Sequence, residues 1–566
     1  MPSHFYVKCL DCGLEAAYAP LSTNCPRCNG EWREARYDYD SLSETLVPSL
    51  QSRPYNLWRY HELLPIHTPY PEISLGEGGT PLIKATNLGT MLGCSNLYIK
   101  DERQGPTASF KDRQAAVTIV ALKEAGITEA VIASTGNVAI SYSAYAARAG
   151  IKLWAFLTSL VPAEKMREVA IYGTQVVKVT SSYDQAKQVA AEFARQRGLY
   201  LDRGTRSVSS VEAMKTIAFE IAERLTWRLD ASTSSENGRP DAGIATPWRA
   251  PDWYVQSVSG GLGPIGVQKG FAELLQMRLI DKIPAIAAIQ TEGCSPMVQA
   301  WRKNERIAEP VTSPRTHIAT LSTGNPGRTY TLLHERMAQG GGGLFESVSD
   351  EEAFRAMHVL AKMEGLSVEP AAAVAFAGLI KLLRAGKINP RDVIVVNCTG
   401  HTMAINPLIL GKGWARNVIL PSQAAFETPE EGLLAALSRV TEDRYSKVLI
   451  VDDTAEARRL ILRIMQSQGN YTLMEASNGR EALELTSRQH PDLIILDLMM
   501  PEMDGFAVLD QLKANPDTAS IPVIVVTAKE LTVQEKDRLN GQIESLMQKG
   551  SFMDNELLNE IRTIVK

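Results

Sequence analysis

The sequence predicts an α/β protein with several domains, on three observations. Between about residues 45 and 412, apolar runs such as AVIAST, KLWAFLT and DVIVVNC alternate with amphipathic runs such as VEAMKTIAFEIAERL. The same alternation returns over 446–566. A short head that carries two cysteine pairs, 1 to about 34, precedes both regions. Strands that alternate with helices favour parallel sheets with helices on their faces, so both longer regions are predicted to be α/β.

Length and charge narrow the classes of partner. The 566 residues suggest three to four domains, at roughly 150 residues each. The chain is 45% hydrophobic and 22% charged, which is typical of a soluble globular protein. With 59 Lys and Arg against 64 Asp and Glu the net charge is −5, so charge gives no reason to expect nucleic acid or an anionic membrane as a partner. Small molecules and proteins are the expected partners.

No apolar run of the sequence approaches the ~18 residues that a membrane-spanning helix needs. The first residues, MPSHFYVKCLDCG, lack the charged and then apolar order of a signal peptide. We therefore expect a cytoplasmic protein with no membrane partner.

Four of the seven cysteines lie in two CxxC pairs of the head: Cys9, Cys12, Cys25 and Cys28. Two such pairs supply four thiolates for a tetrahedral zinc ion, and a four-sulfur site has no open position for catalysis. The head is therefore predicted to be a structural or docking zinc ribbon, with redox disulfides as the alternative. The remaining cysteines are predicted to be small buried apolar side chains: Cys94, Cys294 and Cys398.

Polar turns follow three predicted strands of the middle region. ASTGN places a turn between a strand and a helix, VSGGLG places a glycine-rich turn in a second such position, and the strand VIVVNC ends at Thr399. Ligands of open α/β sheets bind beyond the carboxyl ends of strands, and a glycine-rich turn lets N–H groups approach a phosphate. A fourth segment, PTASFKDR, places Lys111 at the start of an apparent helix. Alone, this lysine would be assigned to the solvated surface.

Taken together, these segments resemble the fold-type II pyridoxal-phosphate enzymes, and among them the threonine synthases. The resemblance covers about 70–410 and depends on LGEGGTPL, PTASFKDR, ASTGN, KTIAFEI, SGGLG, TGNP, MEGLSVEPAAA and NCTGH, which occur in the family order. Some members of the family also carry an N-terminal zinc ribbon. The resemblance implies two α/β subdomains within 45–412 and pyridoxal 5'-phosphate as the cofactor.

The resemblance also implies a role for each matching residue. Lys111 would form the covalent imine with the cofactor, Asn137 would bond its phenolic oxygen, and Thr399 would meet its pyridine nitrogen. The cofactor phosphate would lie in the turn formed by Ser259, Gly260, Gly261, Leu262 and Gly263. An imine lysine needs a pKa depressed by burial, and a neutral hydroxyl at the ring nitrogen suits elimination and replacement better than transamination.

The chain departs from the family pattern at the cofactor site. The family usually has glycine where this chain has Ala108, and asparagines where it has Gly260 and Gly263. Pro264 follows the loop and removes one N–H donor. Because of these departures, the resemblance does not by itself identify the substrate.

A threonine synthase acts on O-phosphohomoserine, so a second anion pocket is expected beside the cofactor. The tentative substrate residues, with Lys84 as an alternative source of positive charge, are Thr80, Ser134, Thr135 and Arg113. A plainer interpretation is that Arg113 and Asp112 pair on one helix face. The expected reaction has Lys111 removing the α-proton, the γ-phosphate leaving, and water adding at the β-carbon.

Four strands of the C-terminal region end in polar residues. KVLIVDD ends in Asp452 and Asp453, LIILDL in Asp497, VIVVTA in Thr527, and IESLMQK in Lys549. Carboxylates that converge at one sheet edge repel each other unless a hard cation such as Mg²⁺ binds them. Over 446–566 this pattern resembles the flavodoxin-like (βα)5 receiver domain of response regulators.

The receiver resemblance implies that a sensor histidine kinase or a phosphotransfer protein phosphorylates Asp497. It also implies a magnesium ion on Asp452, Asp453 and Asp497, with Thr527 and Lys549 as switch residues. Leu546 or a neighbour replaces the usual aromatic of the fifth strand, and Gly550 replaces the usual proline after the lysine.

The segment 413–445 is polar and contains proline, so it is predicted to link the enzyme region to the receiver. The residues 230–253, rich in Ser, Asn, Gly and Pro, are predicted to form a surface loop. Two other functions stay open: a serine or threonine dehydratase or another β-replacement enzyme, and a signalling protein that binds cofactor or metabolite without turnover. A homodimer is one of the assemblies left open.

Overall fold

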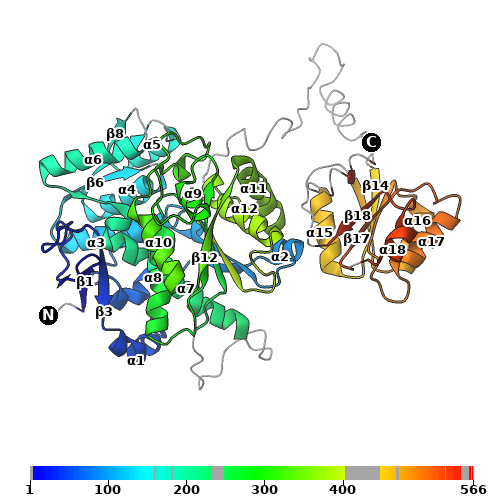
Figure 1. The fold of residues 1–566 in the computed structure, drawn as a ribbon, viewed down its shortest axis with the longest axis horizontal. Helices are drawn as coiled ribbons and strands as arrows, with labels where there is room; N and C mark the ends of the chain where they lie inside the picture. Colours follow the sequence, from blue (N-terminus) through cyan, green and yellow to red (C-terminus); the bar gives the residue numbers. More distant parts are fainter. Residues whose placement is uncertain are drawn as a thin grey trace, which may run out of the picture. The chain divides into compact units, whose positions relative to one another are not determined.

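The computed structural model describes residues 4–134, 136–158, 161, 163–179, 183–230, 248–401, 446–466, 471–529 and 531–549, with single positions of the last helix. The backbone divides into two compact units, and each is described by itself (Figure 1). The first contains nearly all described residues up to 401, and the second contains those from 446 onward. The predicted linker 413–445, most of the predicted loop 230–253, Thr135 and Gly550 lie outside the described residues.

The head folds as a three-stranded antiparallel sheet in the order β2-β1-β3. Its strands are β1 (Phe5–Cys9), β2 (Glu15–Ala16) and β3 (Arg33–Tyr37). Phe5 and Val7 alternate with exposed or half-buried neighbours, and both belong to the hydrophobic core that the larger unit shares with the head. The period-two pattern of FYVKC therefore presents one apolar face to the enzyme body. The helix α1 (Tyr39–Leu50) follows and is capped by Asp38.

The main sheet of the first unit has six strands in the order β12-β11-β10-β13-β5-β4. The bounds are β4 (Leu82–Lys84), β5 (Leu97–Asp101), β10 (Trp253–Ser257), β11 (Ala285–Thr291), β12 (Gly343–Val348) and β13 (Ile394–Cys398). All neighbouring pairs are parallel except β4 with β5, which is antiparallel at the edge. The strand β13 is buried throughout, as expected for a central strand with both faces covered.

The second sheet of this unit has four parallel strands in the order β8-β7-β6-β9. The bounds are β6 (Glu129–Ser134), β7 (Lys152–Thr158), β8 (Gln175–Val179) and β9 (Tyr200–Leu201). The first unit therefore has two separate sheets with helices between their strands. This confirms the predicted α/β class and the two α/β subdomains that the resemblance implied.

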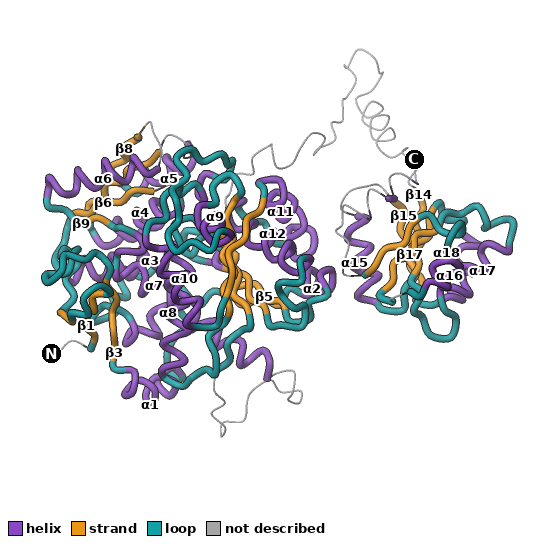
Figure 2. The backbone as a smooth tube through the Cα atoms, in the orientation of Figure 1, coloured by secondary structure: helices purple, strands orange, loops and turns teal. Residues whose placement is uncertain are grey.

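Helices cover both sheets (Figure 2). After α1 come α2 (Thr86–Leu92), α3 (Lys111–Glu124), α4 (Asn137–Ala149), α5 (Ala163–Ile171) and α6 (Tyr183–Arg197). Those that follow are α7 (Val208–Asp230), α8 (Leu262–Gln276), α9 (Pro296–Arg302), α10 (Arg328–Gln339), α11 (Asp350–Glu364) and α12 (Pro370–Arg384). The short 3-10 turns are η1 (Leu57–Leu63), η2 (Glu102–Gln104), η3 (Gly204–Arg206) and η4 (Ala319–Leu321).

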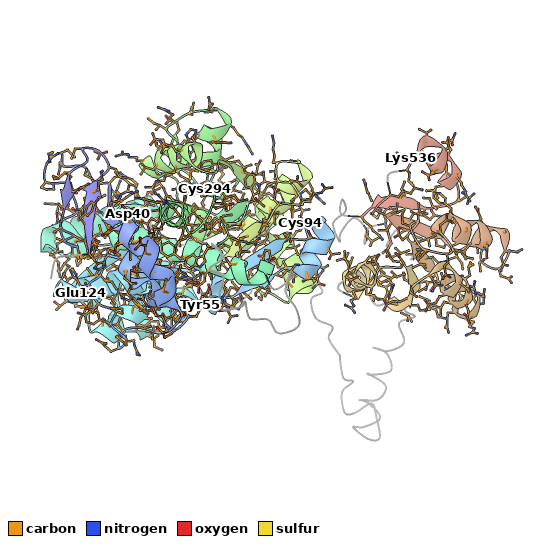
Figure 3. All side chains as sticks on the ribbon, turned by 90° about the horizontal axis from the view of Figure 1, so that it is seen from below. Asp40, Tyr55, Cys94, Glu124, Cys294 and Lys536 are labelled. Carbon is orange, nitrogen blue, oxygen red and sulfur yellow. The ribbon has the colours of Figure 1, made fainter. Side chains whose placement is uncertain are left out.

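Side chains fill the space between these layers (Figure 3). Cys94 and Cys294, both labelled there, are buried, and so is Cys398, which confirms the prediction for the three cysteines outside the head. None of the helices in the described part of the chain combines the length and the apolar character that a membrane span requires.

The second unit is a five-stranded parallel sheet in the order β15-β14-β16-β17-β18. Its strands are β14 (Ser446–Val451), β15 (Tyr471–Ala476), β16 (Leu493–Leu496), β17 (Val523–Thr527) and β18 (Ser545–Gln548). The helices are α15 (Ala455–Gln466), α16 (Gly479–Gln489), α17 (Gly505–Ala514) and α18 (Val533–Leu539). This is the doubly wound topology that the sequence predicts, and the predicted last helix falls mostly outside the described residues.

Candidate active site

The polar turns of the first unit surround one cavity of about 690 Å³. A cavity of this size is typical of a site for a small molecule or cofactor. Its lining includes Lys111 at the start of α3, Asn137 at the start of α4, and Thr399 directly after β13. The complete Ser259 to Gly263 turn before α8 also lines it. The structure therefore brings together the residues for which the sequence predicted cofactor roles.

Lys111 is half-buried, and its Nζ lies 4.1 Å from the centroid of the Phe110 ring. Burial lowers the pKa of Lys111 to about 8, although the nearby carboxylates of Asp202 and Glu369 act in the opposite direction. A substantial fraction of this amine is therefore neutral near pH 8, whereas an exposed lysine would be almost fully charged. A neutral amine is the form that can attack an aldehyde carbon or accept a proton.

Backbone bonds hold the turn before Lys111 against the end of β13. The Phe110 N–H donates to the Thr399 carbonyl at 3.0 Å, and the His401 N–H donates to the Ala108 carbonyl at 3.0 Å. These two bonds fix the start of α3 beside Thr399. Ala108 has a φ of 56°, in the left-handed region that favours glycine, which gives a physical reason for the glycine that the family usually has there.

The turn before α8 has the shape of an anion cradle. Gly261 has a φ of 87°, and a Cβ there would lie 2.7 Å from Cγ2 of Thr329. A Cβ at Gly263 would lie 2.2 Å from Nε2 of Gln256. The backbone can approach a ligand here only because these positions carry no side chain. The positive end of the helix and its unpaired N–H groups favour a phosphate at this position, so the residues present fit the phosphate of pyridoxal phosphate.

Asn137 contacts two charged residues that the sequence analysis did not single out. Its Nδ2 donates to Oε1 of Glu369 at 2.8 Å, and Nζ of Lys165 donates to its Oδ1 at 2.7 Å. Lys165 and Glu369 also form an ion pair at 3.3 Å. Glu369 lies in the segment MEGLSVEPAAA, directly before Pro370 and α12, so its position at a helix start could have identified it.

Asp202 is a second carboxylate that the sequence analysis missed. It follows β9, lines the cavity, and accepts a hydrogen bond from Oγ of Ser210 at 2.8 Å. Burial raises its pKa above the usual range. The rule that identified the other site residues, a polar group at the carboxyl end of a parallel strand, applies to it as well. The strand is only two residues long, which explains why the pattern was missed.

Thr80, Ser134 and Arg113, the tentative substrate residues that the structure describes, do not line the cavity. Arg113 is 1% exposed and bonds Glu102 at 2.8 Å and Glu220 at 2.6 Å. Thr80 donates to the same Glu102 at 2.7 Å. Both therefore belong to a buried ion network, as does Lys100, which bonds Glu220 at 2.6 Å.

Ser134 and Lys84, the other residues considered for the substrate, also do not line the cavity. Oγ of Ser134 accepts bonds from the N–H groups of Gly136 at 3.0 Å and Ala139 at 3.1 Å, so it supports the turn before α4. Lys84 is exposed at the end of the edge strand β4. The structure gives Arg113 and Asp112 different partners. Asp112 accepts a hydrogen bond from the Thr107 N–H at 2.9 Å, whereas Arg113 pairs with Glu102 and Glu220.

The four cysteines of the head converge. Their sulfur atoms all lie within 4.8 Å of one another, with 3.6 Å between Sγ of Cys9 and Cys28 and the same distance between Cys12 and Cys25. All four are free thiols rather than disulfides. Four sulfurs at this spacing are the ligand set that tetrahedral zinc takes, so the residues present fit the ion.

The second unit gathers acidic residues at the carboxyl edge of its sheet. Ligand atoms of Asp452, Asp453 and Asp497 lie within 4.8 Å of one another. Nζ of Lys549 lies 2.6 Å from Asp452 and 2.5 Å from Asp497. Thr527 ends β17 and is buried. Oxygen ligands of this kind suit Mg²⁺, so the three carboxylates fit the ion. Leu546, which replaces the usual aromatic residue of the fifth strand, lies on β18 and is 41% exposed.

Comparison with known proteins identifies both units. Residues 73–400 match the family model described as pyridoxal-phosphate dependent enzyme, and 448–562 match the response regulator receiver domain. A threonine synthase of Methanocaldococcus jannaschii is 34% identical over 70% of this chain and 91% of its own length. Threonine synthases of Methanosarcina acetivorans and Mycobacterium tuberculosis are 31% and 30% identical, over 70% and 63% of this chain and 92% and 91% of their own lengths. The chain belongs to the threonine synthase branch of the pyridoxal-phosphate-dependent enzymes, fused to a C-terminal response-regulator receiver domain.

Proposed function

We propose that the first unit converts O-phosphohomoserine and water into threonine and phosphate with pyridoxal phosphate as its cofactor. The observation that carries the proposal is the position of Lys111, whose half-buried amine lines the same cavity as the glycine cradle before α8. The relatives that bear the name threonine synthase match about nine-tenths of their own length, which supports the choice of substrate.

When bound, pyridoxal phosphate supplies an aldehyde that links to amines and a ring that withdraws electrons from the substrate carbons. Lys111 would hold the cofactor by its amine, the Ser259 to Gly263 turn would bind its phosphate, and the Thr399 hydroxyl would meet its ring nitrogen. Asn137, held by Glu369 and Lys165, would bond the phenolic oxygen. Each of these groups is positioned by the start of a helix or the end of a strand.

The amino group of the substrate would take the place of Lys111 on the cofactor, and the freed Lys111 amine would then act as the base that takes the α-proton of the substrate. The bond between the γ-carbon and the phosphate oxygen breaks, inorganic phosphate leaves, and water supplies the hydroxyl at the β-carbon. The atoms balance as O-phosphohomoserine plus water giving threonine plus phosphate. A base with a pKa near 8 is well matched to proton transfer at neutral pH, because both of its protonation states are populated there.

A product assay tests this proposal. The purified full chain loaded with pyridoxal phosphate is expected to release threonine and phosphate from O-phosphohomoserine in equal amounts. Ammonia and a keto acid from serine or threonine, without threonine synthesis, would support a dehydratase. Cofactor binding without any product would support a sensor that does not turn over.

For the head we propose a structural zinc ion on the four cysteines of the two CxxC pairs. Free thiols at this spacing suit a reducing compartment such as the cytoplasm, where cysteines bind metal rather than form disulfides. Metal analysis of the purified chain is expected to find one zinc ion per chain, and replacement of Cys9 and Cys12 by serine is expected to abolish it.

For the receiver we propose that a histidine kinase or a phosphotransfer protein phosphorylates Asp497, with Mg²⁺ on Asp452, Asp453 and Asp497 and with Thr527 and Lys549 facing the phosphoryl group. The acidic cluster and the Lys549 ion pairs support these roles. Incubation with a small phosphoryl donor and Mg²⁺ is expected to add one phosphoryl group at Asp497. Asp497→Asn should abolish the addition, whereas the exposed control Asp517→Asn should not.

A further inference from the structure

The head forms part of the wall of the active-site cavity. Glu31 and Trp32, which follow the second CxxC pair, line the same cavity as Lys111 and the glycine cradle. The predicted zinc ribbon is therefore attached to the enzyme body at the cavity itself, so a change in the head can act on the site directly.

One carboxylate of the head bridges two arginines of the body. Oε1 of Glu31 accepts a bond from Nη1 of Arg203 at 2.7 Å, and its Oε2 accepts one from Nη1 of Arg206 at 2.8 Å. Both arginines lie around η3, directly after Asp202, and both line the cavity. The Arg203 side chain is 13% exposed and that of Arg206 is 38% exposed, so the pair is partly shielded from water.

A second anchor of the head comes from the backbone and from Asp11. Nη2 of Arg203 donates to the carbonyl of Thr23 at 3.0 Å. Asp11, which lies between the two cysteines of the first pair, forms an ion pair with Arg328, another residue of the cavity lining. Three arginines of the cavity are therefore held by head residues close to the four thiols.

Arg203 and Arg206 share the single carboxylate of Glu31 in the wall of the cavity. Neighbouring positive charges repel each other, and Arg206 lowers the pKa of Arg203 after burial, the larger cause. Glu31 offsets one of the two charges and leaves the pair with a net positive charge. Arginine presents its N–H groups in a planar fork that matches phosphate oxygens, and each guanidinium uses only one nitrogen on Glu31.

We propose that Glu31 is a positioning residue that holds Arg203 and Arg206 as the subsite for the substrate's phosphate, so that the metal-bound fold of the head sets the affinity for phosphorylated substrate. This inference rests on the proposed function for the identity of the substrate. It replaces Arg113, which the buried ion network occupies, as the source of positive charge for the second anion.

Substitution of Glu31 in the full-length holoenzyme tests the proposal. Glu31→Gln keeps the shape but loses the carboxylate that orients both guanidinium groups. If this loss of position outweighs the gain in net positive charge, as the proposal requires, KM for O-phosphohomoserine rises about tenfold, the equivalent of ~1.4 kcal/mol, with kcat unchanged. The matched control is Glu15→Gln, which removes an exposed carboxylate of the same head that pairs with Lys8 at 3.6 Å. It should leave both constants unchanged. A KM for Glu31→Gln equal to or below that of the wild type would overturn the proposal.

Calorimetric binding of inorganic phosphate to the holoenzyme separates this proposal from the choice of substrate. Glu31→Gln and Arg206→Gln are each expected to weaken phosphate binding, whether or not O-phosphohomoserine is turned over. If the chain makes no threonine but these variants still lose phosphate affinity, the proposed reaction fails and the subsite stands. If phosphate binds the variants as it binds the wild type, the subsite is overturned.

Metal removal tests the coupling between the thiols and the arginines. Chelation of the head metal is expected to raise KM of the wild type as Glu31→Gln does, and to add little to the KM of that variant, because both changes release the same contacts. An unchanged KM after the metal is shown to be lost would contradict the coupling. The absorbance of the bound cofactor should be the same in all samples.

Discussion

Ala108, in the turn before Lys111, has a left-handed backbone conformation that favours glycine. Its φ of 56° lies in the left-handed region, where the Cβ of a residue other than glycine costs roughly 1–2 kcal/mol of steric strain. Ala108→Gly is expected to raise the free energy of unfolding by roughly 0.5–1 kcal/mol, since the greater freedom of glycine in the unfolded chain cancels part of the gain. Denaturant unfolding measures this change.

The control for this prediction is Ala125, an exposed residue after α3 with a φ of −80°. Ala125→Gly relieves no strain and should lower the free energy of unfolding. Equal destabilisation by both substitutions would show that position 108 is not strained.

The pKa of Lys111 predicts how cofactor binding depends on pH. Burial holds this pKa near 8, below the value of 10.5 for an exposed lysine, so the amine loses its proton in the folded chain at lower pH. The rate at which pyridoxal phosphate rebinds to the cofactor-free chain is expected to rise with pH and level off above about 8. Stopped-flow absorbance measures it. A rate that still rises steeply between pH 9 and about 10.5 would indicate an exposed amine.

Single residues show what the sequence can and cannot predict. Lys111, Asn137 and Thr399 were predicted from motifs at strand and helix ends, and the structure brings them to one cavity. Arg113 was assigned to the substrate because the sequence cannot tell a buried charge from an exposed one. Its partners Glu102 and Glu220 are 11 and 107 positions away.

At the scale of elements, the buried ion network joins β5, η2, α3 and α7. Burial alone would raise the pKa of Glu220, but Arg113 and Lys100 lower it well below its usual range. Arg113→Ala would leave two buried carboxylates with Lys100 alone, and is expected to lower the free energy of unfolding by about 3–5 kcal/mol. Arg195→Ala, which breaks an exposed pair with Glu192, should cost no more than ~1 kcal/mol.

Denaturant unfolding monitored by circular dichroism compares these two variants. A loss for Arg113→Ala as small as that for Arg195→Ala would show that the network adds little to the packing of α3 on α7. Activity should fall for Arg113→Ala only as far as folding does, because Arg113, Glu102, Glu220 and Lys100 do not line the cavity.

The alternation of strands and helices was predictable, because buried parallel strands are apolar throughout and amphipathic helices follow them. The strand order was not. β13 is the last described strand of the first unit, yet it lies between β10 and β5 in the main sheet. The antiparallel edge strand β4 is three residues long, too short for its direction to be evident from the sequence.

At the scale of the whole molecule, the chain joins a metabolic enzyme to a phosphorylation domain. A linker raises the local concentration of two joined domains, which favours coupling between them. Beryllofluoride with Mg²⁺, a mimic of the phosphorylated aspartate, is expected to change kcat/KM or the oligomeric state of the full chain. Neither should change in Asp497→Asn. If the wild type responds in neither measurement, the two activities are independent.

The attachment of the head could not be predicted from the sequence, because it depends on pairs such as Glu31 with Arg203 that lie 172 positions apart. The zinc ligands were predictable, since their spacing is local. Long-range ion pairs of this kind leave no periodic signal, and only the folded chain shows that the head reaches the cavity.

The central claim is that Lys111 carries the cofactor. Borohydride reduction of the purified holoenzyme, followed by proteolysis and mass spectrometry, is expected to find the pyridoxyl group on the peptide that contains Lys111 and on no other lysine. A label on Lys165, on a different lysine, or on none would contradict the account.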